Sequence, residues 1–517
     1  MAASNDRRMR GFKRWMKFHG IECSDALLIS TGNRSDDDSS RPLSISVTAL
    51  GDLKEGDVVS TIPKQSCLTV KTSAACHLIE EVQLGGYLGL AVAIMYEKSI
   101  GHQSKWFEYL QILPPFEPIP LLWSLPEIDS LLSGTELHKP FCRQIVKEDK
   151  ALVNQDWKEC IKPLLDTASF ELNPDYFTVD QYLAAKSLIA SRSFQIDEYH
   201  GPGMVPLADL FNHKTAAEDV HFTSVSSNSE SDTDTESVLE NADDENDGDE
   251  EPIAPGFYSE TGDFSESDLE LSPVSGNEPT FLEMIIIKDV KAGAEVFNTY
   301  GSLGNAALLH RYGFTEPDNP FDILNIDLHI VVQWSLSLFS CRHSRRRLSL
   351  WRKLEYSGCV SQDSEYFEIS IDGEPQVELL VLLYIMLLPE EDFFKVDLAL
   401  SGTGEETPSS RLLKKESFFL DKDLELNKKL LLTQSVCQAL SSLADARESF
   451  YGPNSLEDYV KAFNDCCSES DPKSYHSLIL RISERRIIEK LRHFAASGAG
   501  NMRIASGTRK RKRVDRK

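Results

Sequence analysis

One stretch of the chain, residues 224–280, contains eighteen Asp and Glu and no Lys or Arg. It is also rich in Ser, Gly and Pro, so it cannot bury enough apolar surface to offset the entropy lost on ordering. We therefore predict that this stretch is disordered. A strand-like segment, residues 281–287, follows it, and an apolar segment, residues 204–213, precedes it. The chain on both sides is expected to form one fold, with the acidic stretch as a loop at a sheet edge.

The acidic stretch also carries most of the net charge. The 517 residues have a formal charge of −28, and the chain without the stretch has −10. Such acidity is not typical of a general nucleic-acid binder, because phosphate contacts need a basic face. We expect no direct nucleic-acid contact. The longest apolar run, residues 377–388, is too short to cross a membrane, so no membrane contact is expected either.

The ten cysteines contain no Cys-x-x-Cys pair, which argues against a zinc ribbon and predicts no metal. Scattered cysteines are also typical of a reducing compartment. The hydrophobic share of 41% is enough for a real core, and the length favours two to four domains. The N-terminus has no apolar signal core.

Periodicity suggests a mixed first part and a mainly helical second part. Short strands are expected at 43–47, 58–62, 281–287 and 295–300, and helices at 12–19, 87–98, 179–191, 379–388, 427–446, 456–467 and 473–496. The expected division is an N-terminal helix and loop (1–42), a mixed domain (43–321) with a helical insert (about 86–190) and the acidic insert (224–280), a helical domain (322–496) and a basic tail (497–517).

Three short segments carry candidate chemistry. They are Ser191-Arg192-Ser193-Phe194, then Asp209-Leu210-Phe211-Asn212-His213, then Phe297-Asn298-Thr299-Tyr300-Gly301 with Asn305 and Tyr312-Gly313-Phe314 after it. Each alone has an ordinary structural explanation, such as an ion pair, a cap or a core aromatic. The phosphate-binding, zinc-protease and serine-hydrolase motifs are absent from the sequence.

Taken in this order and spacing, the segments resemble the SET-domain lysine methyltransferases of the Rubisco large-subunit methyltransferase class. Residues 86–137 are similar to the helical insert of that class, and residues 322–495 to its helical substrate-binding domain. The sequence of residues 297–301 is most similar to the nuclear and ribosomal-protein-modifying branch of this class. The resemblance implies an α+β fold, with a knotted SET core of small sheets followed by an all-α domain.

The resemblance also implies a role for each matched residue. S-adenosyl-L-methionine is the expected cofactor, held by Asn212 and His213 and by Arg192, which faces the cofactor's carboxylate, with Asp209 as a weaker match. Tyr300 is the expected catalytic tyrosine and is also expected to contact the cofactor. Tyr312 and Phe314 are expected to wall the lysine channel. One position departs from the family pattern, because Ser46 stands where the first strand usually has a glycine.

Physical chemistry agrees with these roles. Methyl transfer from a sulfonium to an amine needs alignment and a neutral amine more than a nucleophilic side chain. A free lysine has a pKa of about 10.4. Desolvation among aromatic rings and the nearby sulfonium charge both favour the neutral amine, so no Asp or Glu base is expected.

The leading hypothesis is a monomeric protein-lysine N-methyltransferase that acts on a basic ribosomal-type or histone protein. The basic block at residues 509–513 predicts import into the nucleus. The acidic stretch is either a tolerated loop or a device that attracts basic substrates. One alternative is a non-catalytic SET-like scaffold that binds a protein partner. Another keeps the enzyme and makes histidine the methylated residue.

Overall fold

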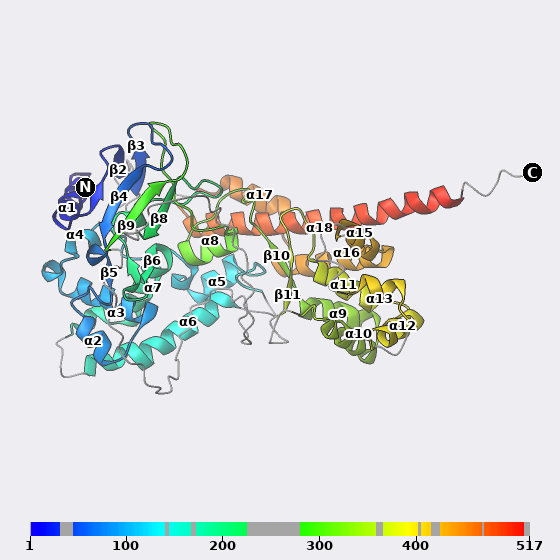
Figure 1. Cartoon of the computed structure of the whole chain (residues 1–517). Coiled ribbons are helices and arrows are strands. Elements are labelled where there is room, and N and C mark those ends of the chain that lie inside the picture. The colour runs from blue at the N-terminus through cyan, green and yellow to red at the C-terminus, as the bar shows by residue number, and fades with distance from the viewer. Residues whose placement is uncertain are drawn as a thin grey trace, which may run out of the picture.

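The computed structural model arranges the chain as two lobes, with one long helix running along both (Figure 1). The structure describes residues 2–31, 45–139, 144–166, 172–224, 280–357, 365–401, 405–414, 424–467 and 470–510. The first lobe (residues 2–322) combines small sheets with helices, and the helical lobe (residues 323–510) is almost wholly helical. The stretch predicted to be disordered, 224–280, lies outside the described residues except at its two ends.

The described part of the first lobe contains three small antiparallel sheets. The largest has the strand order β1 (Glu22–Cys23), β4 (Val58–Pro63), β9 (Phe281–Ile286) and β8 (Val220–Ser224). The other two are β2 (Leu27–Thr31) paired with β3 (Ile45–Ala49), and the set β5 (Leu68–Thr69), β7 (Gly201–Met204) and β6 (Ser193–Asp197).

The acidic stretch joins two neighbouring strands at the edge of the largest sheet. β8 is the edge strand and pairs with β9 from Val220 opposite Ile286 to Ser224 opposite Leu282. Alternate residues of β9 are buried, as expected for a strand with one face on the core. The prediction that the chain on both sides of the stretch forms one fold is confirmed.

The N-terminal segment is part of the first lobe, so the predicted boundary after residue 42 is wrong. β1 pairs with β4, and β2 pairs with β3. In α1 (Ala2–Phe18), the buried Trp15 donates its indole N–H to the Lys105 carbonyl at 2.6 Å. Phe18 is 85% exposed, whereas Met16 is buried. Strands this short leave too little periodicity to be recognised from sequence.

Residues 295–300 do not form the regular strand that was predicted. They make single bridges instead, from Glu295 to Thr48 and from Asn298 to His213. The segment therefore contacts β3 at Glu295 and His213 at Asn298. Because it changes partner within four residues, it does not pair with one strand along its length.

The remaining elements of the first lobe are helices, most of them in the predicted insert. They are α2 (Cys76–Glu81), α3 (Gly86–Ser99), α4 (Phe107–Leu110), α5 (Leu125–Leu131), α6 (Ile145–Asp156), α7 (Val179–Arg192) and, after the acidic stretch, α8 (Asn305–Tyr312). The buried face of α3 packs against α7, and α7 leads directly into β6.

The helical lobe begins with the strand pair β10 (Leu324–Asp327) and β11 (Tyr366–Ile369). Its helices are α9 (Leu328–Leu338), α10 (Cys341–Lys353), α11 (Val377–Leu387), α12 (Glu390–Leu400), α13 (Pro408–Leu412), α15 (Leu424–Leu431), α16 (Gln434–Glu448), α17 (Leu456–Asp465) and α18 (Pro472–Lys510). None of the helices in the described ranges is both long and apolar enough to span a membrane.

Two helix predictions in this lobe differ from the structure. The segment expected as one helix, 427–446, is two helices, because the Thr433 hydroxyl accepts from the Val436 N–H and begins a new helix there. The last helix continues beyond the predicted end at 496, as far as Lys510. The backbone of the expected basic tail is therefore helical up to that residue, and residues 511–517 lie outside the described residues.

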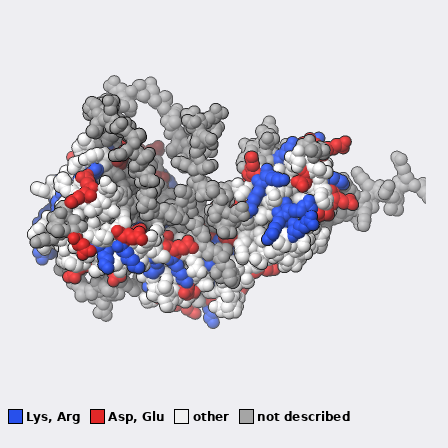
Figure 2. All heavy atoms as spheres, turned by 90° about the horizontal axis from the view of Figure 1, so that it is seen from below, with Lys and Arg blue, Asp and Glu red and all other residues white. Residues whose placement is uncertain are grey.

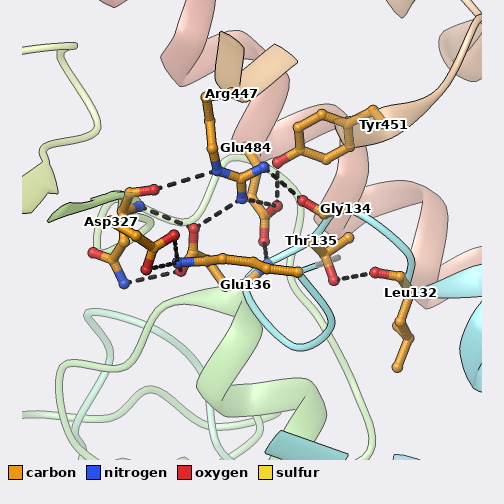
Figure 3. Close-up of polar contacts among 10 residues, drawn as sticks. Leu132, Gly134, Thr135, Glu136, Asp327, Arg447, Tyr451 and Glu484 are labelled. Atoms are coloured by element: carbon orange, nitrogen blue, oxygen red, sulfur yellow. Dashed lines mark hydrogen bonds and ion pairs between the residues drawn. The ribbon is translucent and has the colours of Figure 1, made fainter. Parts of the chain in front are cut away.

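A buried ionic cluster locks the two lobes together (Figure 3). Arg447 of α16 donates to the Gly134 carbonyl at 2.6 Å and to the Glu136 carboxylate at 3.0 Å. Glu484 of α18 accepts the Glu136 N–H at 3.0 Å and the Tyr451 hydroxyl at 2.5 Å. Lys139, the second cation of the cluster, pairs with both Glu136 and Asp327 at 3.0 Å. The junction is thus held by charges that are satisfied away from water.

Positive charge gathers on one face of the helical lobe, seen from below in Figure 2. Helix α10 has the sequence CRHSRRRLSLWRK, in which Arg342, Arg345 and Lys353 are exposed. The negative net charge of the chain is therefore not spread evenly over its described surface.

Candidate active site

The predicted segments around Asn212 and Tyr300 lie side by side. His213 and Asn298 form a parallel bridge, and the Asn298 N–H donates to the Asn212 carbonyl at 2.9 Å. The Tyr300 N–H donates to Nδ1 of His213 at 3.0 Å. Hydrogen bonds therefore fix the segment that leads to Tyr300 against the Asn212-His213 segment.

Four aromatic rings form one cluster at this junction. The Tyr300 ring stacks on His213, with centroids 4.9 Å apart, and on Tyr312, with centroids 4.4 Å apart. The Phe314 ring lies 6.0 Å from His213 and 6.5 Å from Tyr300. The structure thus brings together Tyr300, Tyr312 and Phe314, which were predicted to be catalytic, and His213, which was predicted to bind the cofactor.

Gly313 allows Tyr312 and Phe314 to enter this cluster from opposite sides of a turn. It ends α8 in the left-handed conformation, with φ of 79°. A Cβ at this position would also lie 3.1 Å from the Pro118 carbonyl carbon. Only glycine suits both the conformation and the close approach.

Burial sets the protonation of the two central rings. It raises the pKa of Tyr300, so the hydroxyl stays protonated at neutral pH. It lowers the pKa of His213, so the imidazole stays neutral, in keeping with an Nδ1 that accepts a hydrogen bond. The Tyr300 hydroxyl lies 3.4 Å from the Phe211 carbonyl oxygen.

Arg192 lies at the end of α7 and keeps part of its guanidinium free. Nε donates to Glu117 at 2.6 Å, and Nη1 donates to the Asp209 carbonyl at 2.9 Å. Within the described residues Nη2 has no hydrogen-bond partner, and the side chain is 22% exposed. Burial would lower the pKa of Arg192, but the charges of Glu117 and Asp209 raise it, so the group remains a cation.

The Asp209 carboxylate points into the lobe. One oxygen accepts the Tyr109 hydroxyl at 2.6 Å, and Oδ1 has no hydrogen-bond partner among the described residues. Burial raises the pKa of Asp209 to about 6, although Arg192 opposes the shift. In this geometry Asp209 supports Arg192 through its main-chain carbonyl.

The Asn212 side chain connects β3 to the segment before Tyr300. Its Nδ2 donates to the Ile45 carbonyl at 3.0 Å and to Glu295 at 2.7 Å. The neighbouring Ser46 hydroxyl lies 3.1 Å from that of Ser30, its cross-strand partner. The serine at the usual glycine position therefore takes part in the β2–β3 pair.

Three further residues near the cluster had no role predicted from the sequence. Asn305 is buried and exchanges hydrogen bonds with the main chain of Glu316, which fixes the segment after Phe314. His476 of α18 contacts the Thr315 hydroxyl at 2.9 Å, so the helical lobe reaches this segment. Glu117 holds Arg192. Only Asn305 had a sequence signal, because it belongs to the motif after Gly301.

The donor set fits S-adenosylmethionine. The free edge of Arg192 suits a carboxylate, because two parallel N–H groups match two carboxylate oxygens. Aromatic faces such as those of Tyr300 and Tyr312 attract a cationic centre. Among the residues that the structure describes, no group of three His, Cys, Asp or Glu is placed to hold a metal ion.

Comparisons with known proteins point in the same direction. No protein-family model matches the chain. The chain is 27% identical over 325 residues to ribosomal lysine N-methyltransferase 3 of Saccharomyces cerevisiae, covering 54% of the chain and 58% of that protein. It is 24% identical over 408 residues to N-lysine methyltransferase setd6 of Salmo salar, covering 74% and 75%. The chain therefore spans less than two thirds of the yeast relative.

Solved structures establish the fold. The SET domain of LSMT bound to lysine and AdoHcy matches with a TM-score of 0.57 at 19% identity, over 95% of this chain and 91% of that one. Rubisco LSMT bound to AdoMet matches with a TM-score of 0.55 at 17% identity, over 95% and 92%. The chain has a SET fold. The predicted α+β class and the resemblance to SET-domain lysine methyltransferases are confirmed.

Proposed function

We propose that the chain is a protein-lysine N-methyltransferase that uses S-adenosylmethionine. The observation that carries the proposal is the contact cluster of Tyr300, Tyr312, Phe314 and His213. The SET fold supports it, as do the relatives, which are named as lysine methyltransferases in yeast and in salmon.

Arg192 and the Asn212-His213 segment would hold the cofactor. Arg192 offers its free edge to the carboxylate, and Asn212 and His213 line the junction with Tyr300. When bound, S-adenosylmethionine supplies a methyl group carried on a positively charged sulfur. The residues around it have only to align the amine and exclude water.

The aromatic cluster favours a neutral lysine amine. A lysine ammonium placed among these rings loses hydration, so its pKa falls. The protonated Tyr300 hydroxyl accepts or donates one hydrogen bond and so orients the amine. The carboxylates around the cluster already have partners: Glu117 bonds to Arg192, Asp209 to Tyr109, Glu295 to Asn212 and Glu316 to the Thr215 N–H. No carboxylate base is therefore required.

The proposed substrate is a basic protein of the ribosomal or histone type. The name of the yeast relative supports a ribosomal substrate, and the net charge of −28 favours association with basic proteins. We further propose that the chain acts as a monomer without direct contact to nucleic acid or membrane. The basic face of the helical lobe (Figure 2) would repel a basic substrate, so the substrate is expected to approach the first lobe from another side.

The basic block at 509–513 supports a nuclear location. Replacing its five residues with alanine in a fluorescently tagged chain should move the protein from the nucleus to the cytoplasm. A tagged variant that stays nuclear, with the unaltered chain also nuclear, would remove this part of the proposal.

The activity is tested by transfer of a labelled methyl group from S-adenosylmethionine to a lysate enriched in ribosomes and histones. A labelled band should appear with the wild type and with the exposed-tyrosine control Tyr199→Phe, and should disappear with Tyr300→Phe. Mass spectrometry of the band should identify methyl-lysine. Methyl-histidine there would reassign the substrate residue, and cofactor binding without any transfer would favour a scaffold.

A further inference from the structure

Glu117 lies outside every motif of the sequence, in the proline-rich connection between α4 and α5. Its side chain is 10% exposed, and its Oε1 accepts the Arg192 Nε–H at 2.6 Å. Removing a carboxylate this far from water is costly unless a partner compensates for it. The ion pair joins residues 75 positions apart, so the fold brings this carboxylate to Arg192.

The connection that carries Glu117 is itself fixed on three sides. The Glu117 N–H donates to the Ser187 hydroxyl of α7 at 3.0 Å. Its carbonyl accepts the Ile119 N–H at 2.8 Å. The next residue, Pro118, lies against Gly313, where a Cβ would come within 3.1 Å. Glu117 is thus held between the helix that ends at Arg192 and the turn between Tyr312 and Phe314.

This arrangement fixes the plane of the Arg192 guanidinium. Glu117 takes Nε, and the Asp209 carbonyl takes one N–H of Nη1. Nη2 and the second N–H of Nη1 have no partner among the described residues. A carboxylate ligand can accept two parallel hydrogen bonds from a guanidinium edge, and binding is tighter when the group is oriented beforehand.

We propose that Glu117 is a positioning residue for the cofactor's carboxylate, acting by orienting Arg192. The inference rests on the proposed function, because it assumes a cofactor with a carboxylate at Arg192. Charge alone predicts the opposite effect: Glu117 is an anion near the site, and its removal would strengthen carboxylate binding. The direction of the change therefore separates orientation from simple repulsion.

The test measures ligand dissociation constants by calorimetry on the full chain. The ligands are S-adenosylhomocysteine, which has the carboxylate, and 5′-methylthioadenosine, which lacks the amino-acid end. Glu117→Gln should weaken S-adenosylhomocysteine binding about tenfold and change 5′-methylthioadenosine binding less than twofold. Glu117→Asp, which keeps the charge, should be intermediate. The control Glu127→Gln, which loses an exposed pair with Lys473, should match the wild type.

Coupling to Arg192 provides the second readout. In the double variant Glu117→Gln/Arg192→Met, binding of S-adenosylhomocysteine should be no weaker than in Arg192→Met alone, because Glu117 acts only through Arg192. Unchanged or tighter binding in Glu117→Gln, equal loss for both ligands, or additive loss in the double variant would each overturn the inference. A wild type that binds neither ligand would overturn the proposed function itself.

Discussion

Two arginines, Arg192 at the end of α7 and Arg447 at the lobe junction, have similar hydrogen-bond partners but differ in exposure. Each donates to one glutamate and to a main-chain carbonyl, Arg192 to Glu117 and Asp209, Arg447 to Glu136 and Gly134. Arg447 also uses Nε, on the Asn325 carbonyl, and its side chain is fully buried. Arg192 leaves one edge unbonded and is 22% exposed.

The carboxyl groups beside the two arginines show a similar parallel. Each accepts a tyrosine hydroxyl, Asp209 from Tyr109 and Glu484 from Tyr451. Burial raises the pKa of Asp209 to about 6 and that of Glu484 to about 8. What separates the two sites is the free edge of Arg192. A fully bonded arginine stabilises the fold, whereas a partly bonded one is available to a ligand.

The largest expected effect comes from Arg447→Met. It removes one of the two cations that hold the buried Glu136 carboxylate, the other being Lys139, which costs about 3–5 kcal/mol of unfolding free energy. Urea denaturation should show this loss, and Arg447→Lys should lose less. A variant as stable as the wild type would show that the junction does not depend on this cluster.

Glu484→Gln should change how stability depends on pH. Burial, with Glu136 nearby, raises the pKa of Glu484 to about 8, whereas an unfolded glutamate titrates near 4.3. At a pH between these two pKa values, Glu484 is protonated in the folded chain and ionised in the unfolded chain. Wild-type stability therefore falls as pH rises from 5 to 8.

Urea midpoints of wild type and Glu484→Gln at pH 5 and pH 8 measure this difference. The variant should gain relative to the wild type as pH rises, because glutamine has no proton to lose. A constant difference between the two proteins over this range would contradict the assignment.

Tyr109→Phe should lower the unfolding free energy by a smaller amount, through its effect on Asp209. It removes the hydrogen bond to the Asp209 carboxylate, whose Oδ1 already has no partner among the described residues, and costs about 1–3 kcal/mol. The loss should shrink below pH 6, where Asp209 is protonated in the folded chain. Thermal unfolding of the wild type and the variant at pH 5 and pH 7.5 measures the loss of stability at each pH. Equal losses at the two pH values would contradict the prediction.

The smallest effect is expected for Asp445→Asn, the matched control for Arg447. Asp445 of α16 pairs with Arg492 of α18 at 2.8 Å, on the same two helices but at the surface. An exposed pair contributes less than about 1 kcal/mol. A loss as large as that of Arg447→Met would mean that the α16–α18 contact in general, and not burial of the charges, stabilises the junction.

The sequence alone was enough to select the candidate site residues that lie in continuous motifs. Arg192, Asn212-His213, Tyr300 and Tyr312 could be selected because the order of short segments was similar to that of a known family. The structure brings the aromatic members into contact. The roles of the individual residues remain predictions for the experiments above.

Contacts between distant parts of the chain could not be predicted in this way. Glu117 meets Arg192 across 75 positions, and Glu136 meets Arg447 across 311. Both glutamates occur in irregular connections, where periodicity carries no information about packing. The strands β1 and β2 were missed for a related reason, since each is defined by its partner more than by its own composition.

The most direct test of the account is calorimetric titration of wild type and Arg192→Met with S-adenosylhomocysteine and 5′-methylthioadenosine. If the free edge of Arg192 binds the carboxylate, the variant should bind S-adenosylhomocysteine at least tenfold more weakly, a loss of about 1.4 kcal/mol or more, and 5′-methylthioadenosine as well as the wild type does. Its unfolding free energy should change less than that of Arg447→Met. Equal affinity of wild type and variant for S-adenosylhomocysteine would contradict the central claim that this arginine is left open for a ligand.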